Sequence, residues 1–593
     1  MAEEEEVQLC MQLFDPIEKQ ESWQKHLIVE RPNMWPNGSV ITCSFIKAPS
    51  LKKGQTELQL TPRIRRLIRH YAHEWERYAN IKLRFVDDES FSADVRISLI
   101  SGAGSYSYIG TVCQKDNLRS HNTMNFGWFT DSLPLRSFER TVTHEFGHAI
   151  GCVHEQFSPS LKITWIKPKV YKAYKDSDGW EETDVNLNFN NFVSVDIKTH
   201  EYTSWDKRSI MHYPIKKEWN EEKIEVGWNY VMSDVDKKFI GEKYPFDQDN
   251  STSSDDHLLE RTAYAAVDVY EYQHGKMYLR LFCQAESGSL YQITSVYRDG
   301  SPAVIEDPVC KVEHIPTSQG FEAVPNTGLA SIVHYDGPGI PTVHLFYIDR
   351  STHNIREIVW INGEQTAMND LGIQADARSS LSALYWRGDK KVPNLRLYYQ
   401  APSGAIKEIC KTGMDGEWSE GGVIGGHPLP GTAMSFVNRF IDKADIHGYW
   451  QSPNGTIQEV SGDGESWTIS PWSIDGAADF TALAAAVVGD RKNPHVVVYY
   501  TDPMDNLFRT TTGSPDKEHL EKDIIGEGSR MAVVSSDSGF HVITSGMTNC
   551  IMKLVFPKGS GHPKGASKLK LEHDSTLKYG RVFRLLDYGW RAL

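Results

Sequence analysis

The stretch Thr143-His-Glu-Phe-Gly-His-Ala-Ile-Gly-Cys-Val-His-Glu155 decides the character of the first half of this chain. His144 and His148 are four residues apart, which places both imidazoles on one face of a helix. Gly151 tolerates a positive φ, so the helix can stop there and the chain can turn back. That turn brings His154 towards the first two rings. The spacing predicts three histidine ligands for one Zn²⁺ ion, with a fourth position open to water.

Glu145 follows the first of these histidines directly in the sequence. A carboxylate at this position is expected to take a proton from water and pass it to a leaving amine. The alternative is a helix carrying three ordinary surface histidines, but the full spacing from His144 to His154 is much rarer by chance than two histidines four residues apart. We therefore predict one Zn²⁺ per chain and a hydrolytic reaction.

A second motif, Ser209-Ile-Met-His-Tyr-Pro214, places Met211 57 residues after His154 (211 minus 154). Together the two motifs resemble the astacin subfamily of the metzincin metalloproteases. The stretches Trp35–Ile41 and Ser101–Gly110 are similar to the N-terminal subdomain of that family. The resemblance covers about residues 33–246 and implies an α+β domain that hydrolyses peptide bonds in a protein or peptide substrate.

The resemblance also implies roles for individual residues. Tyr213 is a fifth, switchable zinc ligand whose phenol stabilises the oxyanion; the alternative is a core tyrosine under a turn. Met211 packs beneath the metal, and Glu155 contacts an amino terminus freed by activation. The strand expected at Thr123–Trp128 is either the edge strand that pairs with substrate or an ordinary strand.

The N-terminal residues depart from the secreted members of that family. Residues 1–32 are an acidic leader, read either as a short pro-segment or as a solvated tail, with Cys10 and Asp15 as candidate zinc caps. Ser105 stands where the family usually has a half-cystine. Met1–Glu6 has neither a basic nor an apolar stretch, so we expect cytoplasmic synthesis, with a non-classical route as the alternative for an exported protein. The eight cysteines show no CxxC spacing and are expected to be free and mostly buried.

Residues 247–257 read as a polar linker, after which short strands replace long helical periodicity. One pattern then recurs six times: Leu279–Gln284, Val343–Tyr347, Leu395–Gln400, Ile446–Gln451, Val496–Tyr500 and, more weakly, Phe540–Ile543. The second residues of these units, 280, 344, 396, 447, 497 and 541, are 64, 52, 51, 50 and 44 apart. A period near 50 with three or four strands per unit predicts an all-β propeller of about six blades over residues 258–593.

These repeats resemble the fucose-binding propellers of fungal lectins. The resemblance implies an arginine and a glutamate on neighbouring strands that hold sugar hydroxyls, with an aromatic ring against the sugar. The residues that carry the pattern are Arg396, Glu408 and Trp418 in blade three, His447, Glu459 and Trp467 in blade four, and His344, Glu357 and Trp360 in blade two. In blade one Gln292 replaces the carboxylate beside Arg280, and in blade five Val497 replaces the cation. The alternatives are a degenerate propeller with purely structural residues and a protein-docking platform.

Composition excludes several classes of protein. The 593 residues carry a formal charge of -15, which disfavours a nucleic-acid partner. With 40% hydrophobic residues and a mean hydropathy of -0.45, the chain can bury cores but offers no apolar run for a membrane span. The sequence thus predicts a multidomain protein, a zinc endopeptidase followed by a propeller that binds a fucosylated glycan or glycoprotein. Its rivals are a catalytically silent lectin and an intracellular protease with a scaffolding propeller.

Overall fold

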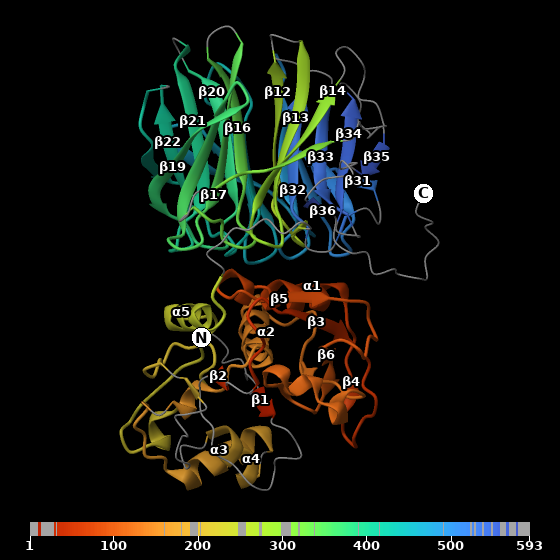
Figure 1. Ribbon diagram of the computed structural model, residues 1–593, viewed down its shortest axis with the longest axis vertical. Helices are drawn as coiled ribbons and strands as arrows, with labels where there is room; N and C mark the ends of the chain where they lie inside the picture. The colour runs from red at the N-terminus through yellow and green to blue at the C-terminus, as the bar shows by residue number, and fades with distance from the viewer. Residues whose placement is uncertain are drawn as a thin grey trace. The chain divides into compact units, whose positions relative to one another are not determined.

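The computed structural model divides the chain into two compact units, one formed by Met1–Asp247 with Phe583–Leu593, the other by Gln248–Val582. Figure 1 colours the first unit red to yellow and the second yellow-green to blue. The structure describes residues 10–13, 29–30, 33–158, 160–179, 181–189, 200–201, 203–246, 256–271, 275–297, 310–317, 321–336, 339–388, 391–413, 415–489, 492–521, 525–526, 529–536, 539–546, 550–557, 565–568 and 577–578. Within these ranges, no helix has the length and apolar character that crossing a membrane requires.

The first unit is built on a six-stranded sheet in the order β1-β8-β9-β6-β3-β5. Its strands are β1 (Cys10–Leu13), β3 (Val40–Phe45), β5 (Lys82–Phe85), β6 (Val95–Ser98), β8 (Ser105–Tyr108) and β9 (Met124–Asn125). The period-two alternation of residues 81–86 and 95–100 in the sequence predicts two strands, and β5 and β6 confirm them. β1 lies parallel to β8, and Cys10 is the register partner of Ser105. β9 lies between β8 and β6, so the interpretation of Thr123–Trp128 as an edge strand is wrong.

Two central helices support this sheet (Figure 1). The pair Thr61-Pro62 in the sequence predicts an N-cap followed by a proline in the first turn. Helix α1 (Pro62–Ala72) begins there, and the Thr61 hydroxyl accepts a hydrogen bond from the Ile64 amide at 3.2 Å. Helix α2 (Leu135–Ala149) packs on α1, and Trp75 donates its indole N–H to the Thr143 carbonyl at 2.8 Å. The remaining helices are α3 (Lys167–Asp178), α4 (Glu182–Phe189), α5 (Asp234–Lys243) and the 3₁₀ turns η3 (Trp75–Arg77), η4 (Gly110–Gln114), η5 (Asp116–Leu118), η6 (Glu155–Phe157) and η7 (Lys217–Trp219). Two-residue strands pair as β2 (Val29–Glu30) with β10 (His200–Glu201), and β4 (Thr56–Glu57) with β7 (Ile100–Ser101).

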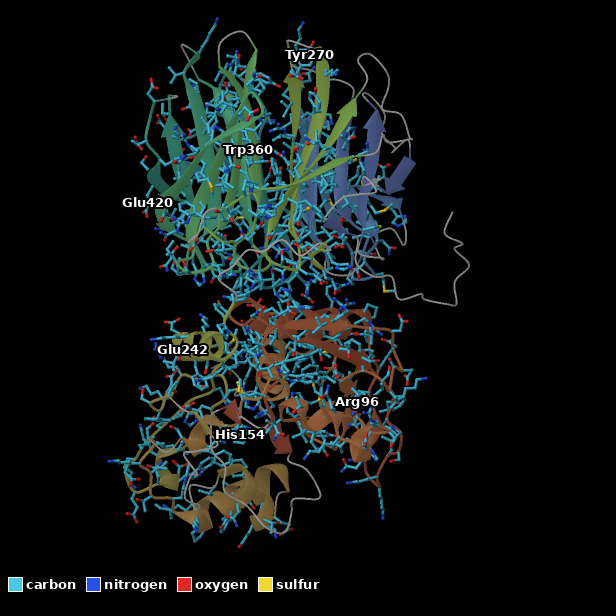
Figure 2. The ribbon with its side chains drawn as sticks, viewed as in Figure 1. Arg96, His154, Glu242, Tyr270, Trp360 and Glu420 are labelled. Carbon is cyan, nitrogen blue, oxygen red and sulfur yellow. The ribbon has the colours of Figure 1, made fainter. Side chains whose placement is uncertain are left out.

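Arg96 is a buried cation that holds the loop between β8 and β9 in place (Figure 2). Its guanidinium donates to the carbonyls of Cys113, Leu118 and His121 at 2.8 to 3.0 Å. Backbone carbonyls here replace the carboxylate that a buried arginine usually needs. Seven cysteines are free, and all except the partly exposed Cys410 are buried, which confirms the expectation for these positions: Cys43, Cys113, Cys152, Cys283, Cys310, Cys410 and Cys550.

The second unit contains six four-stranded antiparallel sheets, which confirms the predicted six-bladed β-propeller. Blade one is β12 (Ala265–Glu271), β13 (Lys276–Gln284), β14 (Leu290–Tyr297) and β15 (Lys311–His314). Blade two is β16 (Ala330–Asp336), β17 (Ile340–Ile348), β18 (Asn354–Ile361) and β19 (Glu364–Gln374). Blade three is β20 (Leu381–Arg387), β21 (Pro393–Gln400), β22 (Ile406–Thr412) and β23 (Ser419–Val423). Blade four is β24 (Met434–Asn438), β25 (Ile446–Gln451), β26 (Ile457–Gly462) and β27 (Trp467–Ile474). Blade five is β28 (Leu483–Val488), β29 (His495–Thr501), β30 (Leu507–Thr511) and β31 (Lys517–Glu521). Blade six is β32 (Met531–Ser536), β33 (Gly539–Ser545), β34 (Ile551–Pro557) and β35 (Gly565–Lys568).

The ring closes between blades six and one through side chains and one short pairing. Tyr264 and Ser545 share a hydrogen bond of 2.8 Å between their hydroxyls. β11 (Asp256–His257) pairs in parallel with β36 (Leu577–Lys578). Asp256, placed at the end of the predicted linker, is 3% exposed and accepts hydrogen bonds from Ser287. The polar stretch therefore ends in a buried anchor, while residues 247–255 lie outside the described ranges.

A recurring glutamine explains one part of the sequence repeat. Gln284, Gln400 and Gln451 end the second strand of blades one, three and four and are each 1% exposed. Each donates its amide N–H to a carbonyl of its own turn and to a carbonyl of the next blade, at 2.8 to 3.5 Å. Each also accepts a backbone N–H from the next blade at 2.8 to 3.3 Å. We call this arrangement the glutamine strap. It satisfies buried backbone groups and fastens consecutive blades.

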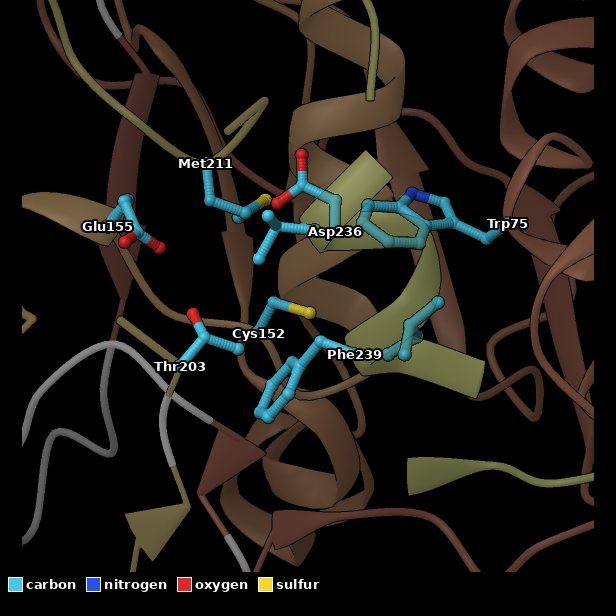
Figure 3. A pocket seen from close by; sticks show the side chains of 9 residues that line it. Trp75, Cys152, Glu155, Thr203, Met211, Asp236 and Phe239 are labelled. Atoms are coloured by element: carbon cyan, nitrogen blue, oxygen red, sulfur yellow. The ribbon is translucent and has the colours of Figure 1, made fainter. Parts of the chain in front are cut away.

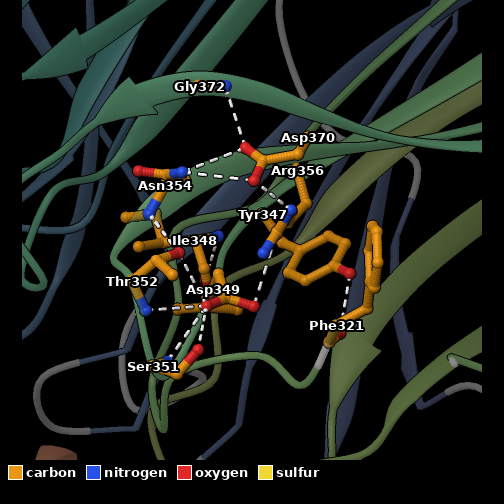
Figure 4. Close-up of polar contacts among 11 residues, drawn as sticks. Phe321, Tyr347, Ile348, Asp349, Ser351, Thr352, Asn354, Arg356, Asp370 and Gly372 are labelled. Atoms are coloured by element: carbon orange, nitrogen blue, oxygen red, sulfur yellow. Dashed lines mark hydrogen bonds and ion pairs between the residues drawn. The ribbon is translucent and has the colours of Figure 1, made fainter. Parts of the chain in front are cut away.

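Charged residues in blade two include a set with a purely structural role (Figure 4). Asp349 is fully buried, and its Oδ1 accepts hydrogen bonds at 2.8 to 3.0 Å from the backbone and hydroxyl groups of Ser351 and Thr352. Arg356 places its Nε 3.4 Å from the other oxygen of Asp349 and forms an ion pair with Asp370. These contacts fix the turn between β17 and β18, so an arginine and a carboxylate in this propeller do not by themselves indicate a ligand site.

Asp268 of β12 is a buried carboxyl group whose burial should make the stability of the protein depend on pH. Neither of its carboxylate oxygens has a hydrogen-bond partner in the described part of the chain, and burial raises its pKa to about 7, partly offset by Lys553. The folded state therefore retains a proton that the unfolded chain releases near its ordinary pKa of 3.8, so stability falls as pH rises between those two values. We expect Asp268→Asn to stabilise the protein at pH 8 by about 1 to 4 kcal/mol and to have little effect near pH 4. Thermal unfolding at both pH values checks this, with the exposed Asp442→Asn as control. An equal effect at both pH values would contradict it.

Candidate functional sites

The three histidines of the first motif come together inside the first unit. The Nε2 atom of His154 lies 3.3 Å from that of His144 and 3.1 Å from that of His148. Each of the three residues is at most 1% exposed, and one ligand atom from each falls within 4.8 Å of the others. Figure 2 labels His154 in this position. Of the described residues, these form the one group of three with metal-ligating geometry.

The other ring nitrogens fix the tautomers of two of these histidines. His144 Nδ1 lies 2.9 Å from the Ile210 carbonyl, and His148 Nδ1 lies 2.7 Å from the Cys152 carbonyl. A carbonyl only accepts, so both Nδ1 atoms carry the proton and both Nε2 atoms keep a lone pair. Burial lowers the pKa of His148 to about 4, and burial together with the neighbouring imidazoles lowers the pKa of His144 and His154 well below the usual value. Three neutral imidazoles with converging Nε2 atoms, two of which have a lone pair set by these carbonyls, fit Zn²⁺.

Two glycines make this geometry accessible to the backbone. Gly151 follows the end of α2 with a φ of +106°, a region that other residues rarely adopt, and the chain turns there towards His154. A Cβ on Gly147 would lie 2.5 Å from the Met211 sulfur. The turn that bears Met211 therefore packs directly against α2. The Glu155 amide donates to the Met211 carbonyl at 3.0 Å, which joins the two motifs.

Glu145 and Tyr213 lie at the same centre. Glu145 is adjacent to His144 on α2 and is fully buried. The Tyr213 ring is also fully buried, with its centroid 4.2 Å from that of His154 and 6.0 Å from that of His144. The structure thus places the Tyr213 ring beside the imidazoles, and it buries Glu145 in the same turn of α2 as His144.

A small pocket lies beside Glu155, the residue that follows His154 in the chain (Figure 3). Glu155 accepts the Asp206 backbone amide at 2.8 Å, and burial, together with Asp236 and Asp206, raises its pKa well above the usual value. Asp236 accepts from Ser209 and Ile210 at 2.6 and 2.8 Å, and burial raises its pKa as well. The pocket is lined by Trp75, Cys152, Glu155, Thr203, Met211, Val235, Asp236, Phe239 and Ile240. Asp236 was not predicted as a site residue; its sequence signal is the capping pair with Ser233 at the start of α5.

Blade three presents unsatisfied polar atoms between strands β21 and β22. Arg396 Nε lies 3.9 Å from Glu408 Oε2, and the guanidinium lies 4.9 Å from the centre of the Trp386 ring. Glu408 Oε1 accepts the Gly422 amide at 3.3 Å. Among the described residues, four buried atoms here lack a hydrogen-bond partner: Arg396 Nε, Glu408 Oε2, Tyr398 Oη and Trp467 Nε1. This set can serve both donors and acceptors of a ligand.

Trp418 and Trp467 lie beside other blades than the sequence analysis predicts. Trp418 donates its indole N–H to Glu357 of blade two at 3.2 Å, and the described contacts include none between Trp418 and Arg396 or Glu408. Trp467 of blade four instead lies edge-on to Tyr398 of blade three, with ring centroids 5.8 Å apart. The predicted sets Arg396–Glu408–Trp418 and His447–Glu459–Trp467 are therefore wrong in their tryptophans. Trp418 therefore lies beside blade two and Trp467 beside blade three, because neighbouring blades share a face.

The polar pairs of blades two and four, His344 with Glu357 and His447 with Glu459, already form hydrogen bonds within the protein. Glu357 accepts from His344 at 2.8 Å, from Trp418 at 3.2 Å and from Asn369 at 2.8 Å. Trp360 is 4% exposed and stacks on Phe282 of blade one at 5.6 Å.

In blade four, Glu459 accepts from His447 at 2.8 Å and from Tyr449 at 3.1 Å. These carboxylates have less capacity left for a ligand than Glu408.

Residues 261–542 match the family described as fungal fucose-specific lectin. The fucose-specific lectin g276 of Arthrobotrys oligospora is 35% identical over 347 residues, which cover 55% of this chain and 87% of that protein. Two solved structures are similar: myroilysin, 40% identical over 37% of this chain and 98% of its own, TM-score 0.32, and AofleA from Arthrobotrys oligospora, 22% identical over 53% of this chain and 88% of its own, TM-score 0.44.

Six four-stranded blades with polar pairs on the second and third strands define the second unit as a lectin-like β-propeller. By its match to the lectin from Arthrobotrys oligospora, the chain belongs to the fungal fucose-specific lectin family.

Proposed function

We propose that the first unit is a zinc-dependent endopeptidase of the astacin type. The observation that carries this proposal is the convergence of three buried neutral imidazoles next to Glu145. A bound zinc ion would supply a water of lowered pKa, about 7, and polarise a peptide carbonyl. A peptide or protein in extended form is the substrate class that such a site takes.

The protein's own groups carry the remaining steps. Glu145 accepts a proton from the attacking water and delivers it to the nitrogen of the departing amine. The Tyr213 phenol donates a hydrogen bond to the oxygen of the tetrahedral intermediate. His144, His148 and His154 hold the metal, and Met211 supports their positions through its contact with α2.

Digestion of casein by the full chain tests this proposal, with metal content measured on the same sample. We expect hydrolysis by the zinc-loaded protein, loss of hydrolysis on treatment with a chelator, and recovery when zinc is returned. Absence of hydrolysis by zinc-loaded samples of both the full chain and a chain lacking residues 1–32 would favour the rival interpretation, a catalytically silent lectin.

We further propose that residues 1–32 act as a pro-segment. β1 adds a parallel strand to the outer side of β8, the position that an extended substrate would occupy by strand addition. Removal should expose β8, and the ammonium group created by cleavage would suit the acidic pocket beside Glu155. Asp15 lies outside the described residues, and the structure describes no side chain for Cys10.

Deletion of residues 1–32 is therefore expected to raise the rate of casein hydrolysis by about tenfold or more, since an added strand contributes several backbone hydrogen bonds of roughly 1 kcal/mol each. The rates of full-length and truncated protein at equal zinc content provide the measurement. Equal rates would show that residues 1–32 are a solvated tail and not a pro-segment.

We propose that the second unit binds fucosylated glycans, with its main site in blade three. Its support is the set of unpartnered atoms of Arg396, Glu408 and Trp467. Loss of a hydrogen bond to a charged group costs about 1.5 to 3 kcal/mol, so Arg396→Ala should weaken binding of a fucosylated glycan by roughly 10- to 100-fold. A glycan array followed by titration measures this, with the exposed Arg387→Ala as matched control. Unchanged binding by the Arg396 variant would exclude blade three.

A further inference from the structure

His212, which stands between Met211 and Tyr213 in the second sequence motif, holds the main chain of Tyr213. Tyr213 belongs to no helix or strand, so side chains replace the regular backbone hydrogen bonds. The Tyr213 amide donates to Gln156 Oε1 at 3.2 Å, and the Tyr213 carbonyl lies 2.6 Å from His212 Nδ1. Because only two side-chain torsions separate a tyrosine ring from its main chain, these contacts limit where the Tyr213 ring can point.

The hydrogen bonds of His212 define which ring nitrogen carries the proton. A carbonyl oxygen only accepts, so Nδ1 carries the proton shared with the Tyr213 carbonyl. On the other side of the ring, Trp205 donates its indole N–H to Nε2 at 2.8 Å, and an indole N–H only donates. Nε2 is therefore the lone-pair nitrogen, and the imidazole is neutral. Both nitrogens of this buried ring are satisfied within the protein.

The indole of Trp205 selects this tautomer of His212. Without the indole N–H, the proton can move to Nε2, and Nδ1 then turns a lone pair towards the Tyr213 carbonyl. Two lone pairs across the present 2.6 Å repel each other, so the carbonyl and the imidazole have to separate. Loss of one N–H on Trp205 is thus felt at Tyr213, although the hydrogen bond itself ends on His212.

The loop that bears Trp205 is anchored beside the histidine cluster. The Trp205 amide donates to the Ser160 hydroxyl, and the Asp206 amide donates to Glu155 Oε1 at 2.8 Å. Glu155 follows His154 directly in the chain. The indole and the third imidazole are therefore fixed to one short segment, which keeps Trp205 in place against its acceptor.

We propose that Trp205 is a positioning residue for the reaction of the first unit. It fixes the tautomer of His212, and His212 holds the Tyr213 carbonyl so that the phenol stays beside the three imidazoles. Trp205 and His212 act through Tyr213 and exchange no proton with the substrate. This inference rests on the proposed endopeptidase function, and the experiment separates the two.

Trp205→Phe removes the indole N–H and keeps an aromatic ring. We expect it to lower kcat for casein hydrolysis by roughly 10- to 100-fold, the usual effect of removing a group that orients another at a metal site, with KM and zinc content unchanged. The full chain and the chain lacking residues 1–32 are both measured. The matched control is Trp472→Phe in the propeller, which removes an indole N–H bound to the Ser514 carbonyl at 3.1 Å and should leave kcat unchanged.

Two outcomes of this comparison separate the proposals. If wild type hydrolyses casein and Trp205→Phe has the same kcat, the positioning role is refuted while the endopeptidase function stands. If zinc-loaded wild type hydrolyses nothing in either form of the chain, both are refuted.

A double-mutant cycle shows whether Trp205 acts through Tyr213. In the Tyr213→Phe background no phenol remains to be positioned, so Trp205→Phe should change kcat by less than about twofold. If the two effects multiply instead, Trp205 supports the structure in general and the proposal fails.

His212→Asn is the conservative variant of the middle residue. The asparagine N–H₂ can donate to the Tyr213 carbonyl as Nδ1 does, and it needs no indole to fix its proton. We expect His212→Asn to keep a higher kcat than His212→Phe and to be insensitive to a further Trp205→Phe change. Equal losses in the Asn and Phe variants would refute the role of the Nδ1 hydrogen bond.

Copper substitution provides a readout that does not depend on activity. Cu²⁺ binds imidazole sites more tightly than Zn²⁺, and a tyrosine oxygen bound to Cu²⁺ gives a charge-transfer band in the visible spectrum. We expect this band in the copper-loaded wild type, its loss in Tyr213→Phe and a weaker band in Trp205→Phe at equal copper content. No band in wild type, or a band of full intensity in Trp205→Phe, would show that Trp205 does not hold the phenol at the metal.

Discussion

Glu145→Gln is expected to lower the rate of casein hydrolysis by roughly 10²- to 10⁴-fold, the usual contribution of a positioned general base. The amide keeps the size of the side chain but cannot take a proton from the attacking water. Because the three imidazoles and their carbonyl partners are unaffected, the zinc content should remain that of wild type. Initial hydrolysis rates and metal analysis on the same samples provide the measurement.

The matched control for this substitution is Glu139→Gln, on the same helix but outside the histidine cluster. It should leave the rate within about twofold, as expected for a change that removes no specific interaction at the reacting atoms. A Glu145→Gln protein that contains zinc and hydrolyses casein at the wild-type rate would remove Glu145 from the mechanism.

His148→Ala should abolish both metal retention and hydrolysis. His148 supplies one of three converging Nε2 atoms, and its Nδ1 is fixed by the Cys152 carbonyl, so no neighbouring group replaces it. Even changes in the groups that orient metal ligands lower affinity by about 10- to 100-fold, and loss of a ligand itself should exceed that range. Zinc content after dialysis against a chelator, together with the hydrolysis rate, measures the effect.

The exposed His121→Ala is the control for the histidine series, since His121 lies outside the cluster. It should retain zinc and activity. Retention of zinc by His148→Ala at the wild-type level would show that the metal is bound elsewhere, and the proposed enzymatic function would then lose its basis.

Structural features that depend on residues close in the chain were predicted correctly from the sequence. The Thr61–Pro62 start of α1, the alternation of β5 and β6, and the turn at Gly151 are set by residues close in the chain. Six repeats near 50 residues were sufficient to predict six blades, because each blade is one contiguous segment. The glutamines at 284, 400 and 451 recur at the same place in their repeats, a signal that was visible but had no assigned role.

Contacts between repeats could not be predicted from local sequence patterns. Trp418 belongs to blade three in sequence yet serves Glu357 of blade two, and this pairing exists only after two blades share a face. Likewise, the pairing of Gln292 with Glu313 depends on strand register, with residues 298–309 outside the described part between the two strands. The position of β9 inside its sheet was missed because a strand of two residues has no periodicity to read.

The glutamine strap joins only some pairs of neighbouring blades, so the ring consists of two groups of more firmly joined blades. The equivalent positions in blades two and five are Ile348 and Thr501, so the straps join blade one to two, three to four and four to five, while the Tyr264–Ser545 bond joins six to one. The seams after blades two and five lack this fastening. Under mild denaturant, slow amide exchange should therefore persist longest within two arcs of three blades each, and the propeller should come apart as two half-circles.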